Sequence, residues 1–234
     1  MKILALESSA KAASCALVAD GMPLATAWQA TGLTHSRTLL PMVQDMLKNS
    51  ELSLADVDAV AVAAGPGSFT GLRIGLAAVK GLAWAAEKPC IGVSTLEAMA
   101  YPLSHIDGVI VCAMDARRQQ IYNAVFLASD GELTRLREDR AISLEEAAAD
   151  LRDFDGPLTI VGDGAQLAFD YFTKAGIDCV LAPAHLRSQS AVGVALAAEA
   201  AGQDALVSAQ DLSPNYLRLS QAERERLERE KNKQ

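Results

Sequence analysis

The sequence is poor in the residues that mark special classes of protein. Aromatic residues fill only 5% of its 234 positions, so its core must be aliphatic and rich in alanine. The four cysteines stand far apart in apolar segments, and no pair has the spacing of zinc ligands. We therefore expect reduced core cysteines, as in cytoplasmic proteins, at Cys15, Cys90, Cys112 and Cys179.

Long apolar runs are missing as well. The run that follows Met1 ends at Glu7, which is too short for a signal peptide or a membrane-spanning helix. The sequence therefore predicts a soluble protein of the cytoplasm with no membrane partner. Half of the residues are hydrophobic and 21% are charged, a globular composition that suits one large domain or two lobes of about 100 residues.

Motifs of hydrolases and metalloenzymes are also absent. The three histidines, His35, His105 and His185, are far apart and form neither His-x-x-x-His nor Glu-x-x-His, so no metal site is expected around them. No Ser/His/Asp set stands out, and the serine of the 65–71 loop is not in a Gly-x-Ser-x-Gly elbow. These absences argue against a peptidase and predict no catalytic residue.

Positive charge is in short supply. Lys and Arg number 21 against 29 Asp and Glu, which gives a net charge of −8 and a sequence pI near 4.9. An acidic chain gains little from contacts with a phosphate backbone, so we expect it to bind nucleic acid poorly on its own.

The sequence does contain a repeat: the same order of predicted elements occurs in both halves. Each half reads strand, hairpin, helix, strand, Gly-x-Gly turn, helix, strand, helix. The first half predicts strands over 3–6, 12–19, 22–28, 59–64 and 90–93, and helices over 34–48 and 71–86 and from 94 or 95. The second half predicts strands over 109–114, 121–128, 133–136, 158–161 and 179–182, and helices over 143–152, 165–175 and 191–201.

The spacing of the repeat predicts the domains. The hairpin turns Asp20-Gly21 and Asp130-Gly131 lie 110 residues apart, and the strand-end acids Glu7 and Asp115 lie 108 apart. We expect two copies of one mixed α/β lobe, over 1–107 and 108–218. Residues 219–234, which are polar with mixed charge, are expected to form a solvated charged tail.

Two details of the first lobe qualify its strands and helices. Pro23 cannot donate to a ladder, so the second hairpin strand is expected at a sheet edge. Pro41 lies inside the helix predicted over 34–48, so that helix should be kinked there or begin later.

The Gly-x-Gly turns are the first candidates for chemistry. Gly65-Pro66-Gly67 and Gly162-Asp163-Gly164 each end a strand and precede a helix, where backbone N–H groups and the helix dipole suit a phosphate. An ordinary strand-to-helix turn is the alternative, and for an isolated Gly-x-Gly it is the commoner one. The loop at 65–71 is no Walker loop, because no Gly-Lys-Ser/Thr follows.

The strand-end acids are the second candidates. A duplicated lobe with an acid at the end of each first strand is the plan of the actin, hexokinase and heat-shock-protein-70 superfamily. Glu7 and Asp115 could jointly hold Mg²⁺, but such acids are also common solvent-facing caps. The superfamily's glycine-bearing phosphate turn is replaced here by the glycine-free turn at 7–11, which hinders close approach to a phosphate.

Several segments together resemble one bacterial family, TsaB (YeaZ). The resemblance covers nearly everything up to Arg218, and the stretch GPGSFTGLRIG is its most specific part. The matching segments are ILALESS at the N-terminus, HSRTLLP from His35, GPGSFTGLRIG from Gly65, STLEA from Ser94, MDARR from Met114 and PNYLR from Pro214.

The resemblance implies a role in making N6-threonylcarbamoyladenosine at position 37 of tRNA, 3′ to the anticodon. It implies a non-catalytic scaffold that pairs with the catalytic paralogue TsaD, with TsaE as an ATPase partner and TsaC supplying threonylcarbamoyl-adenylate. The chain would need no cofactor of its own, would meet tRNA only through the complex, and leaves open a nucleotide at the partner interface. An ATP-dependent small-molecule kinase of the same superfamily stays the alternative.

The resemblance also implies one surface for two dimers: a homodimer in isolation and the pair with TsaD. The predicted helices over 34–48 and 71–86 are the candidates, since the first has an apolar stripe and the second is rich in glycine and alanine. For the helix over 71–86, close packing within the protein, against the lobe's own sheet, is the alternative. The candidate interface residues are Leu39, Val43, Met46, Gly71, Gly75, Val79 and Leu82.

Overall fold

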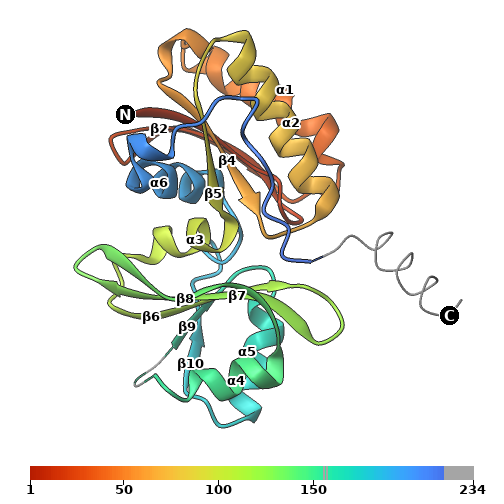
Figure 1. Cartoon of the computed structure of the whole chain (residues 1–234), viewed down its shortest axis with the longest axis vertical. Coiled ribbons are helices and arrows are strands. Elements are labelled where there is room, and N and C mark those ends of the chain that lie inside the picture. Colours follow the sequence, from red (N-terminus) through yellow and green to blue (C-terminus); the bar gives the residue numbers. More distant parts are fainter. Residues whose placement is uncertain (155, 157, 219–234) are drawn as a thin grey trace, which may run out of the picture.

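The computed structural model describes residues 1–154, 156 and 158–218, so the charged tail predicted over 219–234 lies outside the described residues. The chain forms two five-stranded sheets, one above the other in Figure 1, with helices outside and between them. Among the described residues no helix is long and apolar enough to cross a membrane.

The first sheet has the strand order β3-β2-β1-β4-β5, with β1 antiparallel to β2 and parallel to β4. Its strands are β1 (Lys2–Glu7), β2 (Ala13–Ala19), β3 (Met22–Gln29), β4 (Ala59–Gly65) and β5 (Cys90–Ser94). Asp20 and Gly21 have φ of 48° and 75°, as a hairpin turn of this type requires. The predicted hairpin and the edge position of Pro23 are both confirmed.

The second sheet repeats this order as β8-β7-β6-β9-β10, which confirms the predicted duplication. Its strands are β6 (Gly108–Asp115), β7 (Gln120–Ser129), β8 (Glu132–Ser143), β9 (Leu158–Val161) and β10 (Cys179–Leu181). The strand predicted over 133–136 is much longer in the structure. Because β8 is an edge strand with many charged side chains, its apolar pattern ends long before its backbone pairing does.

Two pairs of helices cover the outer faces of the sheets. The first sheet is covered by α1 (His35–Asn49) and α2 (Phe69–Ala85), and the second by α4 (Leu144–Leu151) and α5 (Ala165–Lys174). Helix α1 begins at His35 and continues through Pro41, so of the two alternatives given for the proline the later start is wrong. Pro41 is exposed, so water can reach the carbonyl that the missing N–H leaves free.

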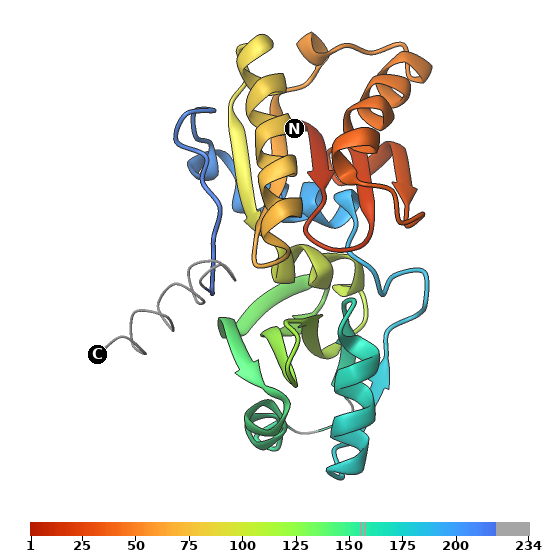
Figure 2. The ribbon, with the colours of Figure 1, turned by 90° about the vertical axis from the view of Figure 1, so that its right-hand side faces the viewer.

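Two further helices lie between the sheets, and each packs mainly on the sheet formed by the other half of the chain. Helix α6 (Ala191–Ala201) comes from the second half of the chain but packs on the first sheet. Helix α3 (Thr95–Ala100) comes from the first half but packs largely on the second sheet and also contacts α6. Sequence periodicity shows that a helix has an apolar face but not which sheet that face covers. The lobe boundary expected after residue 107 therefore separates sheets but not helices (Figure 2).

The described part of the chain also has three 3₁₀ turns: η1 (Leu54–Asp56), η2 (Tyr101–Leu103) and η3 (Gln203–Ala205). After η3, residues 206–218 form an extended segment that we call the C-terminal strap. Val207 exchanges two backbone hydrogen bonds with Cys90 of β5, and Asn215 N–H donates to the carbonyl of Ala64. The strap thus crosses the open edge of the first sheet before it reaches the second lobe, where Arg218 donates to Ala116 O.

Candidate functional site

Each of the two strand-end acids accepts a hydrogen bond from the turn that follows its strand. Glu7 Oε1 accepts a hydrogen bond from the backbone N–H of Ser9, two residues along the chain. Asp115 Oδ1 accepts one from Arg117 N in the same way, at 2.7 Å. A carboxylate that bonds the amide two residues on stabilises a turn by itself. The duplication thus extends to these contacts, and among the described residues no group of three acids, histidines or cysteines is placed to hold a metal ion.

Glu7 is the unusual member of the pair. Its side chain is fully buried, and its Oε2 atom has no hydrogen-bond partner. Burial raises the pKa of Glu7 to about 7, and the carboxylate of Asp163 across the interlobe cleft acts in the same direction. A charged Glu7 is therefore costly to keep in the folded protein at neutral pH.

The first Gly-x-Gly turn is occupied by the protein's own backbone. Ser68 N–H, at the start of α2, donates to Ser9 O at 2.7 Å. A Cβ added to Gly67 would lie 2.7 Å from the same carbonyl oxygen, and one added to Gly71 would overlap the carbonyl of Ser8. Ser8 Oγ in turn donates to Gly71 O at 2.9 Å. Because Gly67 and Gly71 have no side chain, the turn after β1 can pack against the start of α2. It occupies the space through which a phosphate would otherwise approach.

The second Gly-x-Gly turn is filled in the same way. Gly164 N–H donates to Ala113 O at 3.0 Å, and a Cβ at Gly164 would lie 2.6 Å from the backbone nitrogen of Asp115. A Cβ at Gly162 would overlap Ala113 O. In both lobes the ordinary strand-to-helix turn describes these glycines, and the phosphate-binding hypothesis finds no support in them.

A cleft of about 720 Å³ separates the lobes where these turns meet. Its walls carry both signs of charge: Lys11, Arg117 and Arg218 are basic, and Asp115 and Asp163 are acidic. The turn from β6 to β7 is left-handed at three successive non-glycine positions, 117–119, with φ between 55° and 62°. Such a conformation is costly for side-chain-bearing residues. The glycine-free sequence of this turn gave no signal for it.

The C-terminal strap closes one side of the cleft. Tyr216 stacks on Phe69 with ring centroids 4.5 Å apart, and its hydroxyl accepts a hydrogen bond from Arg73 Nε. Beyond it, the Arg218 guanidinium lies over the ring of Tyr122, 5.9 Å from its centre. The strap therefore connects α2 of the first lobe to the second sheet, a role that its sequence did not reveal.

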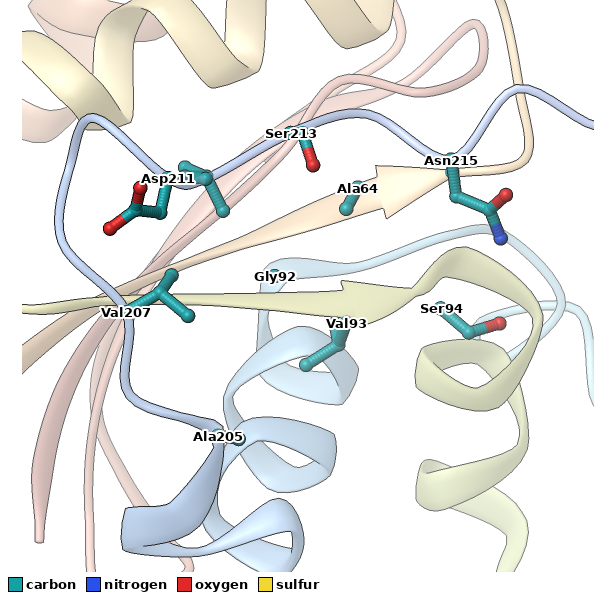
Figure 3. A pocket seen from close by; sticks show the side chains of 11 residues that line it. Ala64, Gly92, Val93, Ser94, Ala205, Val207, Asp211, Ser213 and Asn215 are labelled. Carbon is teal, nitrogen blue, oxygen red and sulfur yellow. The ribbon is translucent and has the colours of Figure 1, made fainter.

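A smaller cavity of about 300 Å³ lies between the strap and the ends of β4 and β5 (Figure 3). Asp211, Ser213 and Asn215 of the strap border it on one side, and Gly92 and Ser94 of β5 border it on the other. A Cβ at Gly92 would lie 3.0 Å from Leu212 Cδ1 and 3.2 Å from Ala64 Cβ, so the packing around it is tight. Asp211 is the one titratable side chain among the residues that line this cavity.

Most of the candidate interface residues are interior residues of the first lobe. Leu39, Val43 and Met46 of α1 and Val79 of α2 are buried in the core beneath the two helices. Gly71 and Gly75 contact the turn at Ser8, and Leu82 is partly buried against the same core. The buried positions face the chain's own sheet, as in the alternative of internal packing, while the partner interface itself stays a prediction.

The outward face of α2 has a different set of residues. Arg73, Ala77, Gly81 and Trp84 follow one another at helical spacing and are exposed. Trp84 is 81% exposed, and a Cβ at Gly81 would meet nothing within 4 Å. A large exposed indole beside small residues is typical of a surface on which another helix packs.

Comparisons with known proteins agree on one family. Residues 29–225 match the family model described as TsaD: tRNA N6-adenosine threonylcarbamoyltransferase. The tRNA threonylcarbamoyladenosine biosynthesis protein TsaB of Bacillus subtilis is 31% identical over 99% of this chain and 100% of its own length. The TsaB protein of Escherichia coli is 37% identical over 76% of this chain and 78% of its own.

A solved structure agrees with these sequence relatives. YeaZ from Pseudomonas aeruginosa superposes with a TM-score of 0.78 over 92% of this chain and 99% of that chain, at 29% identity. The predicted fold, two duplicated actin/hexokinase-like lobes with mixed sheets, is confirmed by this match together with the repeated strand order.

Replacing Glu7 by Gln should stabilise the protein at high pH. The folded-state pKa of about 7 lies above the value of 4.5 for an unperturbed glutamate, so charging Glu7 costs folding stability as pH rises from about 4.5 to about 7. Below pH 4.5 the variant should match the parent protein, and at pH 8 it should be more stable by about 3 kcal/mol. Urea unfolding at the two pH values measures this. Glu138→Gln, at an exposed acid, is the control, and equal stability of parent and Glu7→Gln at pH 8 would contradict the assignment.

The two ends of α2 offer a matched pair of glycine substitutions. Gly71→Ala places a methyl group on the carbonyl of Ser8 and should cost about 2–4 kcal/mol of unfolding free energy. Gly81→Ala enters open space in a helix and should add about 0.5–1 kcal/mol. Chemical denaturation of both variants decides the matter: a harmless Gly71→Ala would show that the turn after β1 does not need the glycine.

Proposed function

The chain belongs to the TsaB family of tRNA threonylcarbamoyladenosine biosynthesis proteins, and on that basis we propose that it is a non-catalytic scaffold in threonylcarbamoylation of tRNA adenosine 37. The observation that carries the scaffold role is the filled turn at the start of α2. Where an ATP-dependent enzyme of this fold needs room for phosphates, Ser9 O is bonded to Ser68 N–H.

The charges of the cleft support the same reading. Phosphate groups require an excess of cationic or N–H donors, whereas the three basic side chains of this cleft are accompanied by the acidic side chains of Asp115 and Asp163. Glu7 and Asp115 are engaged with their own turns. The small-molecule kinase that the sequence left as an alternative is therefore not supported.

The proposed partner is the catalytic paralogue TsaD, with TsaE as a further subunit. The family model that matches this chain is that of the transferase itself, so the two proteins share an architecture. In isolation the chain would pair with a second copy through the same surface, and tRNA would be bound by the complex. We place the surface on the outward face of α2, around Trp84 and Gly81, in place of the buried stripe of α1.

Reconstitution tests the scaffold role. The purified chain, a TsaD-like transferase and a TsaE-like ATPase are combined with threonylcarbamoyl-adenylate, ATP and unmodified tRNA, and modified adenosine is measured by mass spectrometry of digested tRNA. We expect no product and no ATP hydrolysis with the chain alone, and at least a tenfold loss of product when the chain is omitted. Steady ATP turnover by the pure chain, abolished by Glu7→Ala or Asp115→Ala, would show instead that it is an enzyme.

Trp84→Glu should separate the partners without unfolding the chain. The indole is almost fully exposed, so a carboxylate there is solvated in the monomer but is desolvated in a helix-packed interface. Copurification with the TsaD-like protein and self-association in sedimentation should both be lost. Val180→Glu, which charges an exposed position on the second lobe, is the control. If Trp84→Glu loses self-association but keeps the TsaD-like partner, the two dimers do not share a surface.

A further inference from the structure

The edge strand β3 carries no charged side chain. It ends the first sheet, and no strand among the described residues pairs with its outer edge. Three large apolar side chains along it, Met22, Leu24 and Trp28, are each at least half exposed. Residues 21–36 contain no Asp, Glu, Lys or Arg at all. Proteins ordinarily block such an edge with charge, because its free N–H and C=O groups accept another strand.

The duplicated lobe provides an internal comparison. Strand β8 occupies the corresponding edge of the second sheet, and six of its twelve residues are charged. Several of these take part in ion pairs, such as Arg135 with Glu97 at 2.6 Å. The same architecture thus guards one edge with charge, whereas the other carries no charge and is interrupted only by Pro23, near the start of β3. Beyond Pro23, the β3 edge is therefore open to a further strand.

A groove runs beside the bare edge. It has a volume of about 480 Å³ and lies between residues 24–27 of β3 and the C-terminal half of α1. The α1 wall consists of Met42, Asp45, Met46, Asn49 and, just beyond the helix, Ser50. Methionines adapt to varied apolar side chains, and Asp45 is the groove's one charged residue.

We propose that the β3 edge and this groove bind an extended segment of a partner protein as a sixth strand. Main-chain hydrogen bonds to β3 would supply affinity, and alternate side chains of the segment would enter the groove. Charge complementarity identifies the segment as apolar with a basic residue opposite Asp45. This surface is separate from the outward face of α2, so it provides for a partner besides the one bound through Trp84.

A second copy of this chain fits the edge less well. Two β3 strands could pair about a twofold axis, but β3 has no basic residue to place opposite Asp45. The two Asp45 carboxylates of such a dimer would both remain unpaired in the grooves. The chemistry on the α1 wall therefore favours a basic segment from a different protein.

Two probe peptides test this with the full-length protein. One is acetyl-Thr-Val-Thr-Val-Thr-Lys-Thr-Val-Thr-amide, in which Lys shares a face with the valines, and the other has Glu in place of Lys. The Lys peptide should bind at least tenfold more tightly than the Glu peptide in fluorescence anisotropy. Asp45→Lys should reverse this preference, whereas Glu138→Lys, the same charge change on exposed β8, should preserve it. Hydrogen exchange should slow at residues 22–29 on binding.

Three results would overturn the proposal. The first is no binding of the Lys peptide up to about 1 mM, and the second is binding whose charge preference Asp45→Lys leaves unaltered. The third is concentration-dependent self-association that protects residues 22–29 without peptide, which would identify a second copy as the occupant. Copurification of the TsaD-like partner should be the same for Asp45→Lys and the parent protein. Failure of the scaffold role is therefore distinguishable from failure here.

Discussion

The close approach between the turn after β1 and the first turn of α2 is the contact on which the cleft depends. Ser9 O bonded to Ser68 N–H, and Ser8 pressed against Gly71, occupy the space at the carboxyl end of the first sheet. The glycines of this segment are there because two backbone segments meet, and any side chain would separate them. The carboxyl end of the first sheet is thereby filled by the chain's own backbone.

The second constraint is the exchange of α3 and α6 between the sheets. Helix α6 is buried on nearly all sides, and a Cβ at Gly193 would overlap the carbonyl of Ala98 in α3. Arg135 of β8, in the second sheet, forms an ion pair with Glu97 of α3. The lobes are thus joined by packing as well as by chain, and the strap adds a third connection at Tyr216 and Arg218.

Local signals in the sequence were enough for the elements and the duplication. Asp-Gly turns, capping residues such as Ser143 and uniformly apolar strands each leave a short-range pattern. Features that arise between distant segments were missed: the partner sheet of α6, the stacking of Tyr216 on Phe69 and the filling of the Gly-x-Gly turns. The stripe at Leu39 and Val43 was assigned to a partner because periodicity reports an apolar face but not what covers it.

The exchange of helices also has a consequence for synthesis on the ribosome. Strands β1 to β5 are complete by residue 94, yet the face that α6 covers stays bare until residue 201 has emerged. For more than a hundred residues of translation the nascent first sheet exposes Ile3, Ala5 and Ala61. Exposed apolar sheet surface of this kind aggregates and recruits chaperones. The first sheet is therefore complete only once α6 has been made, although the repeat gives each half the pattern of a separate unit.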